Sequence, residues 1–196
     1  MSGAALGVVS ARAVLLLVAL ATFAVAVPGG AEDTAWALLQ RGGQAILLRH
    51  AITTPGVGDP AGMRLDDCST QRNLTDEGRR HAGRVGDAFR ARGVTVDRVL
   101  SSPWCRCQET ARLAFGTAET WAPLSNLFGR PERSVEQVEQ MRALVGEGRT
   151  GGNLVLVTHG STIAALTGIN PAPAEMVVVT PQGGGRFTVA GRLTVP

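Results

Sequence analysis

The sequence predicts a single α/β domain, a three-layer α/β/α sandwich with a mostly parallel central sheet. Two apolar runs, "AILLR" at 45–49 and "NLVLVT" at 153–158, are typical of strands buried on both faces of a parallel sheet. Stretches of helical periodicity alternate with the strands, which predicts a layer of helices on each face. Residues 32–196 are enough for one domain with a hydrophobic core.

The elements follow from their periodicity and their end signals. Paired glycines after an apolar helical stretch mark the end of the first helix, and Pro103 marks the start of the third. Thr75 and Ser134 are expected to cap the helices that follow them. The predicted helices cover 34–43, 74–94, 103–115, 134–147 and a segment from 160. The predicted strands cover 44–49, 97–102, 118–122, 153–159, 175–180 and 186–195.

The N-terminal segment has the pattern of an export signal. Arg12 precedes an apolar stretch of about fifteen residues at 13–27, and Ala24-Val25-Ala26 resembles a cleavage site. A membrane-spanning helix needs roughly twenty apolar residues, so this stretch is short for one. We therefore expect a signal peptide at 1–31, with an uncleaved N-terminal anchor or a buried helix as alternatives. The expected location of the domain at 32–196 is periplasmic or extracellular.

Charge and composition argue against several kinds of partner. All nineteen basic residues are arginine, and the formal net charge is only +3. No basic tract interleaved with aromatic residues occurs, so we expect no nucleic-acid partner. We also expect no membrane contact beyond a possible N-terminal anchor, and the oligomeric state stays open.

The three cysteines, Cys68, Cys105 and Cys107, all lie in the predicted domain. An odd count in an exported protein indicates one disulfide and one free thiol. Cys105 and Cys107 are too close in sequence to be expected to pair, and Cys68 with Cys105 is the preferred bridge. A metal site is the alternative, but paired Cys-x-x-Cys or His-x-x-x-His spacings are lacking, so no metal is predicted.

Each of the two predicted buried strands is followed directly by a histidine, His50 or His159. In open α/β sheets the ligand crevice lies beyond the carboxyl ends of the strands. If the two strands are neighbours, both imidazoles lie in that crevice. Arg49 ends the first strand, and Arg106 lies in the first turn of the predicted helix after another strand. These four side chains are therefore expected to converge on one small volume.

Such a cluster of cationic and donor groups needs an anion between its members. A phosphate monoester, with a charge of roughly −1.5 to −2, fits, and arginine binds its oxygens bidentately. Neighbouring arginines lower a histidine pKa and keep the imidazole of His50 neutral and nucleophilic. His159 is expected to donate a hydrogen bond to the phosphoryl oxygens, and Gly160 opens a helix whose backbone N–H groups suit an anion. The positive charge already present makes a metal or organic cofactor unnecessary.

Three segments in this order, "LLRHA", "SSPWCRCQETA" and "VLVTHGS", resemble the histidine phosphatase superfamily, the phosphoglycerate-mutase-like proteins. The resemblance covers nearly all of 44–170 and implies the phosphoglycerate mutase-like version of the predicted sandwich. Exported members with "DCSTQRNL" and "SPWCR" segments look most similar.

The resemblance implies that His50 becomes phosphorylated, with Arg49, Arg106 and His159 completing the phosphate pocket. The segment "RNLTDEG" at 72–78 is similar to the family turn R-x-L-T-x-x-G, which adds Arg72 as a phosphate contact.

The sequence departs from the family pattern at two places. Ala51 stands where the family has glycine, which would be strained if φ is positive there. Asn126 stands where many members have a glutamate as general acid, and an amide cannot protonate a leaving oxygen. The remaining candidates for that proton donor are Glu132, Asp66, Asp67 and His159, and good leaving groups need none.

Three functions are consistent with these residues. The first is a phosphomonoester hydrolase that acts through a phosphohistidine on an extracytoplasmic phosphorylated small molecule or envelope sugar. The second is a phosphomutase of the same superfamily, which export and the short chain disfavour. The third is a non-catalytic phosphate-binding module, suggested by Asn126 and Ala51.

Overall fold

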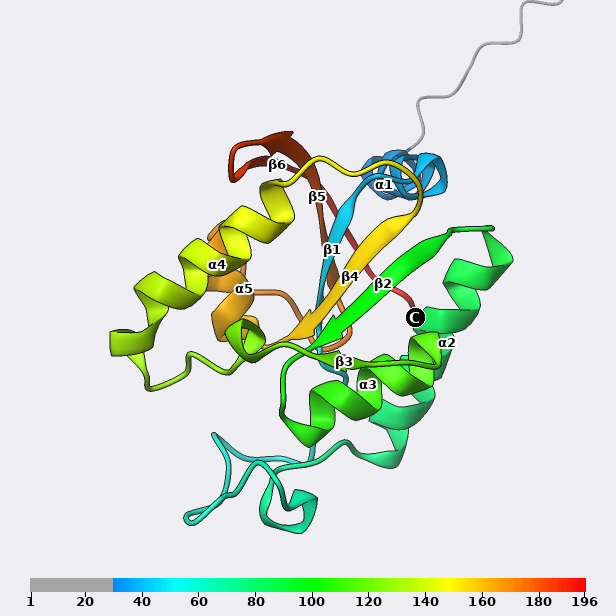
Figure 1. The fold of residues 1–196 in the computed structure, drawn as a ribbon. Helices are drawn as coiled ribbons and strands as arrows, with labels where there is room; N and C mark the ends of the chain where they lie inside the picture. The colour runs from blue at the N-terminus through cyan, green and yellow to red at the C-terminus, as the bar shows by residue number, and fades with distance from the viewer. Residues whose placement is uncertain (1–29) are drawn as a thin grey trace, which may run out of the picture.

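A computed structural model describes residues 30–196, and Figure 1 shows their fold. The predicted signal peptide or anchor at 1–31 lies outside the described residues, apart from its last two positions. Within the described part of the chain, none of the helices has the length and apolar character needed to span a bilayer.

One mixed sheet forms the middle layer. Its strands are β1 (Ala45–Arg49), β2 (Val96–Ser101), β3 (Glu119–Thr120), β4 (Asn153–Thr158), β5 (Met176–Gly183) and β6 (Arg186–Leu193). They lie in the order β3-β2-β4-β1-β5-β6. The first four strands run parallel, β5 is antiparallel to β1, and β6 is antiparallel to β5. The mostly parallel sheet that the sequence predicts is confirmed, with an antiparallel hairpin at one edge.

Helices cover both faces of the sheet. They are α1 (Ala31–Arg41), α2 (Asp76–Ala91), α3 (Cys105–Phe115), α4 (Ser134–Gly146) and α5 (Gly160–Thr167). The first three lie on one face and α4 and α5 on the other, so the three-layer α/β/α sandwich is confirmed (Figure 1).

The core consists of two apolar clusters separated by the sheet. Ile46 and Leu48 of β1 pack with residues of α1, α2 and α3, whereas Ala45 and Leu47 pack with residues of α4 and α5. All four are completely buried. Burial of each large aliphatic side chain contributes roughly 1.5–3 kcal/mol. The uninterrupted apolar run of β1 is thus explained by helices on both sides of it.

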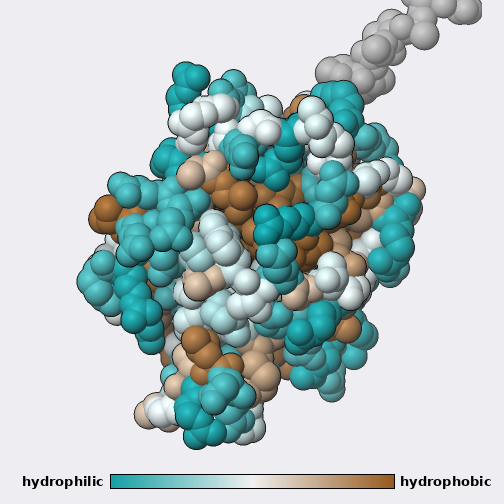
Figure 2. Space-filling model, in the orientation of Figure 1, coloured by the Kyte–Doolittle hydropathy of each residue, from teal (hydrophilic) through white to brown (hydrophobic). Residues whose placement is uncertain are grey.

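The outer surface is mixed in character. On the face seen in Figure 2, hydrophilic residues dominate and hydrophobic ones gather in small groups between them. The exposed large hydrophobic residues include Val57 and Phe128, and both line the cavity described below.

Some element boundaries differ from the sequence-based predictions. The helix predicted from Pro103 begins at Cys105, with Trp104 at its cap position, because Pro103 still belongs to the turn that leaves β2. Arg133, not Ser134, is at the cap position of α4. Thr75 caps α2 as predicted, since its side chain accepts a hydrogen bond from the Gly78 backbone N–H.

The pairing of β1 with β4 positions the site. The two strands are parallel neighbours, with Arg49 opposite Thr158. The next residue of each strand is a histidine, so His50 and His159 leave the sheet side by side. The His50 backbone N–H donates to the Thr158 carbonyl at 2.9 Å, which extends the pairing into the site. The long segment between β1 and α2 lies beyond these carboxyl ends (Figure 1).

Candidate active site

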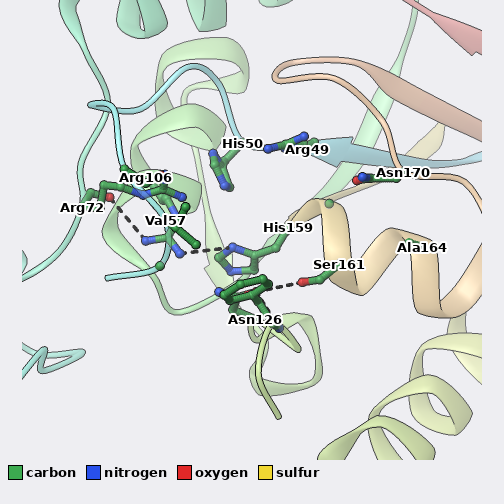
Figure 3. Close-up of a pocket in the computed structure, with 14 residues that line it drawn as sticks. Arg49, His50, Val57, Arg72, Arg106, Asn126, His159, Ser161, Ala164 and Asn170 are labelled. Carbon is green, nitrogen blue, oxygen red and sulfur yellow. Dashed lines mark hydrogen bonds between the residues drawn. The ribbon is translucent and has the colours of Figure 1, made fainter. Parts of the chain in front are cut away.

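The structure brings together the side chains that the sequence singles out. Figure 3 shows His50, Arg106 and His159 around one space, with Arg72 and Val57 on one side of it. This space is a cavity of about 370 Å³. Its walls contain every residue predicted for the site: Arg49, His50, Arg72, Arg106, His159 and Gly160.

His50 is held with one ring nitrogen free. The residue is 4% exposed, and its Nδ1 lies 2.9 Å from the Ala51 carbonyl oxygen. A carbonyl only accepts, so Nδ1 carries the proton and Nε2 keeps its lone pair. Burial, together with the charges of Arg106 and Arg49, lowers the pKa of His50 to about 3. The imidazole is therefore neutral and nucleophilic at neutral pH.

Ala51 fits this arrangement without backbone strain. Within residues 30–196 the only non-glycine residue with a positive φ is Ala174, so the concern about Ala51 does not arise. Ala51 is fully buried, and its N–H donates to the Thr110 hydroxyl at 3.1 Å.

Both ring nitrogens of His159 have a polar neighbour in the structure. Its Nε2 lies 2.8 Å from the Ser102 hydroxyl, and its Nδ1 lies 3.5 Å from an Arg106 Nη atom. A guanidinium only donates, so in the free protein Nδ1 accepts and the ring proton is on Nε2. Burial and the nearby His50 and Arg106 hold the pKa of His159 well below its usual range. Donation to a phosphoryl oxygen, as predicted, therefore requires protonation of Nδ1 when the dianion is bound.

Three arginines surround the cavity with unused donors. The Nε atoms of Arg49, Arg72 and Arg106 are buried and have no hydrogen-bond partner. Buried donors are normally paired, so three orphan N–H groups at one cavity indicate a missing acceptor. Burial and the charge of Arg72 lower the pKa of Arg49, which shows that the guanidinium groups disfavour one another without an anion.

Gly160, the first residue of α5, has little room for a side chain. A Cβ at this position would lie 2.7 Å from the Asn170 Oδ1 and 3.4 Å from the Arg49 side chain. The bare backbone lets the start of α5 approach the cavity, as an anion at a helix N-terminus requires.

The general acid expected of the family has no carboxylate counterpart in the cavity wall. Asn126 lines the cavity, and its Oδ1 accepts from the Ser161 hydroxyl at 2.8 Å. None of the described residues lining this cavity is an aspartate or glutamate. Of the proton donors that the sequence suggests, Asp66, Asp67 and Glu132 do not lie in the wall, and only His159 does.

Sequence reasoning missed two residues next to the cavity. Asp59 binds Arg106 through both carboxylate oxygens, at 2.6 and 3.2 Å. Trp104 donates its indole N–H to Asp59 and contacts the His159 ring edge-on, with centroids 5.2 Å apart. An aspartate in a glycine- and proline-containing segment resembles an ordinary turn residue, so its sequence carries no signal of this role.

The disulfide lies beside the site. Cys68 and Cys105 are bridged, as the sequence analysis preferred, and Cys107 is a buried free thiol. The bridge ties the segment before α2 to the residue immediately before Arg106. No group of three or more potential metal ligands occurs among residues 30–196.

Comparison with known proteins is consistent with this site. The sequence model of the histidine phosphatase superfamily (branch 1) matches residues 45–141. Among curated proteins, none matches the sequence significantly.

Several solved structures share the fold at low sequence identity. Phosphoserine phosphatase from Entamoeba histolytica has 15% identity and a TM-score of 0.56, covering 77% of this chain and 96% of that one. The α-ribazole phosphatase from Shigella flexneri has 16% identity and a TM-score of 0.54, with 78% and 96% covered. The mycobacterial glucosyl-3-phosphoglycerate phosphatase has 18% identity and a TM-score of 0.53, with 75% and 96% covered.

The family match covers the strand that ends in Arg49 and His50 and the helix that carries Arg106, and the remaining strands complete the shared fold. The chain therefore belongs to the histidine phosphatase superfamily, branch 1.

Proposed function

We propose that this protein is a phosphomonoester hydrolase that acts through a phosphohistidine at His50. The observation that carries the proposal is that three arginines with unpaired Nε–H groups line one cavity together with a neutral histidine that has a free ring nitrogen. A phosphoryl group supplies oxygens for those donors and places its phosphorus within reach of His50.

The reaction would run in two steps. First, the Nε2 lone pair of His50 attacks phosphorus, the bond from phosphorus to the ester oxygen breaks, and that oxygen leaves with a proton from His159 or water. Then water attacks the phosphohistidine, the N–P bond breaks, a proton is released, and inorganic phosphate leaves. Arg49, Arg72 and Arg106 would stabilise the charge on the phosphoryl oxygens in both transition states.

We infer that the substrate is a phosphorylated small molecule or envelope sugar outside the cytoplasm. A cavity of about 370 Å³ suits a small phosphomonoester. The similar structures are phosphatases named for phosphoserine, α-ribazole and glucosyl-3-phosphoglycerate, all small compounds. The apolar stretch at 13–27 and the bridge between Cys68 and Cys105 both favour an exported protein.

The test is phosphate release from para-nitrophenyl phosphate without added metal, by the wild type and by His50→Ala. We expect turnover in the wild type, its loss in the variant, and an acid-labile phosphoprotein after rapid quenching of the wild type alone. His81→Ala is the matched control, because His81 lies on α2 and contacts the Val195 carbonyl, away from the cavity. Full activity in His50→Ala would refute the mechanism.

Two other outcomes would favour the alternatives. Transfer of phosphate within a substrate, without release of inorganic phosphate, would indicate a phosphomutase. Tight binding of phosphate without turnover, in folded protein, would indicate a binding module.

A further inference from the structure

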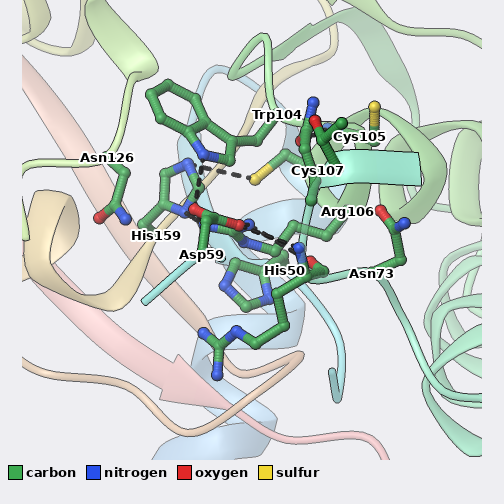
Figure 4. Close-up of polar contacts among 12 residues, drawn as sticks. His50, Asp59, Asn73, Trp104, Cys105, Arg106, Cys107, Asn126 and His159 are labelled. Atoms are coloured by element: carbon green, nitrogen blue, oxygen red, sulfur yellow. Dashed lines mark hydrogen bonds and ion pairs between the residues drawn. The ribbon is translucent and has the colours of Figure 1, made fainter. Parts of the chain in front are cut away.

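A carboxylate from outside the cavity wall holds the most buried arginine of the site. Arg106 is 1% exposed, and the side chain of Asp59 is 9% exposed. Figure 4 shows the Asp59 carboxylate between Arg106 and the Trp104 indole. Asp59 Oδ1 accepts from Arg106 Nη1 at 2.6 Å, and from the Arg72 backbone N–H at 3.1 Å. Asp59 Oδ2 accepts from Arg106 Nη2 at 3.2 Å and from Trp104 Nε1 at 3.0 Å.

We propose that Asp59 is a positioning residue, which fixes the Arg106 guanidinium so that its Nε–H, the one donor left without a partner, is available to the phosphoryl group. This inference rests on the proposed function of the site. Asp59 binds the outer end of the guanidinium through both Nη atoms, which leaves Nε as the buried donor without a partner in a residue that lines the cavity. A planar guanidinium that is hydrogen-bonded through both Nη atoms cannot rotate, so the direction of its Nε–H is set before substrate binds.

The same carboxylate couples two arginines that come from different parts of the chain. It receives the backbone N–H of Arg72 as well as the side chain of Arg106. The bridge between Cys68 and Cys105 joins the same two segments. Asp59 thus sets the distance between two phosphate donors, and its negative charge offsets part of their mutual repulsion.

Two other roles for Asp59 fit the structure less well. A general acid must carry a proton. Desolvation by burial would raise the pKa of Asp59, but the hydrogen bonds from Arg106, Arg72 and Trp104 outweigh it, so the pKa of Asp59 is lowered and the carboxylate is ionised. It is also absent from the cavity wall. As a competitor for the phosphate site it would have to leave four donors at once, which makes displacement by substrate costly.

The test uses Asp59→Asn in the full chain, with Asp66→Asn as the matched control. Asp66 lies in the same segment, loses the same charge, and has an 87% exposed side chain. Affinity for inorganic phosphate is measured by calorimetry, and kcat/KM is measured with para-nitrophenyl phosphate and with glycerol 2-phosphate. We expect Asp59→Asn to bind phosphate about tenfold more weakly and to lose roughly 10- to 100-fold in kcat/KM on both substrates, with Asp66→Asn unchanged.

Each contrary result overturns a defined part of the reasoning. If Asp59→Asn keeps its phosphate affinity and loses kcat/KM only with glycerol 2-phosphate, Asp59 is a general acid. If the variant binds phosphate more tightly than the wild type, Asp59 competes with phosphate for the site. If Asp59→Asn does not fold, Asp59→Glu decides, because a carboxylate displaced by one methylene should weaken phosphate binding; full affinity there refutes the proposal. A wild type that neither binds nor hydrolyses phosphate compounds would refute the proposed function and this inference together.

Discussion

Lowering the pH should destabilise the fold through His50, and the effect can be isolated with His50→Asn. Burial lowers the pKa of His50 to about 3 in the folded protein, whereas an unfolded histidine titrates near its ordinary 6.5. Between these two pH values, His50 is protonated in the unfolded chain and neutral in the folded protein. The contribution of His50 to stability is complete above about pH 6.5 and declines as the pH falls from there toward about 3.

The magnitude follows from linkage between the two pKa values. Between pH 7 and pH 5 His50 alone should remove about 2 kcal/mol from the free energy of unfolding. Asparagine cannot titrate in this range, and its amide can donate to the Ala51 carbonyl that Nδ1 of His50 contacts. The wild type should therefore lose about 2 kcal/mol more than His50→Asn over this interval.

The assay is urea unfolding of both proteins at pH 7 and pH 5, in buffers without phosphate and with the disulfide intact. His81→Asn serves as the control for a histidine outside the cavity. All other groups titrate in both proteins, so the difference between them reports His50. Equal losses in the wild type and in His50→Asn would refute the claim that burial keeps this imidazole neutral.

Three further predictions concern packing and cysteine chemistry. Gly78→Ala should lower the free energy of unfolding, measured with urea, by about 3 kcal/mol, because the new Cβ would lie 2.0 Å from the Ile52 carbonyl oxygen. Gly83→Ala on the same helix is the control and should be neutral or stabilising, because the space around its Cβ is open. Reduction of the disulfide, which spans a sequence separation of 37, should lower the free energy of unfolding by about 4 kcal/mol; an unchanged urea midpoint would contradict this. Burial raises the pKa of the Cys107 thiol to about 12, so iodoacetamide at pH 8 should label it only after unfolding, and rapid labelling of native protein would show that it is accessible.

The strand ends were predictable because they depend on local patterns. The apolar runs before His50 and His159 are buried on both faces, and such strands point their carboxyl ends toward the ligand crevice. That the two strands are neighbours had to be assumed, since strand order depends on the whole chain. The observed pairing of Arg49 with Thr158 confirms the assumption.

The support around the arginines could not be predicted in the same way. Asp59 lies in a segment without periodicity, and its importance comes from a contact with Arg106, 47 residues away. The only available signal was electrostatic, because several arginines gathered at one site call for a counter-charge close by. Asp66 and Asp67, nearer to the motif residues, instead pair with Arg64 at the surface.

The order of the strands also determines when the site can exist during folding. β4 lies between β2 and β1 in the sheet, although it follows both in the chain by more than fifty residues. Until β4 inserts, the strand that delivers His50 and the one that leads to Arg106 have no common neighbour to align them. A nascent chain that ends before β4 therefore contains His50 but no assembled anion pocket. Phosphoryl chemistry becomes possible only when the segment from β4 onward, less than a quarter of the chain, completes the sheet.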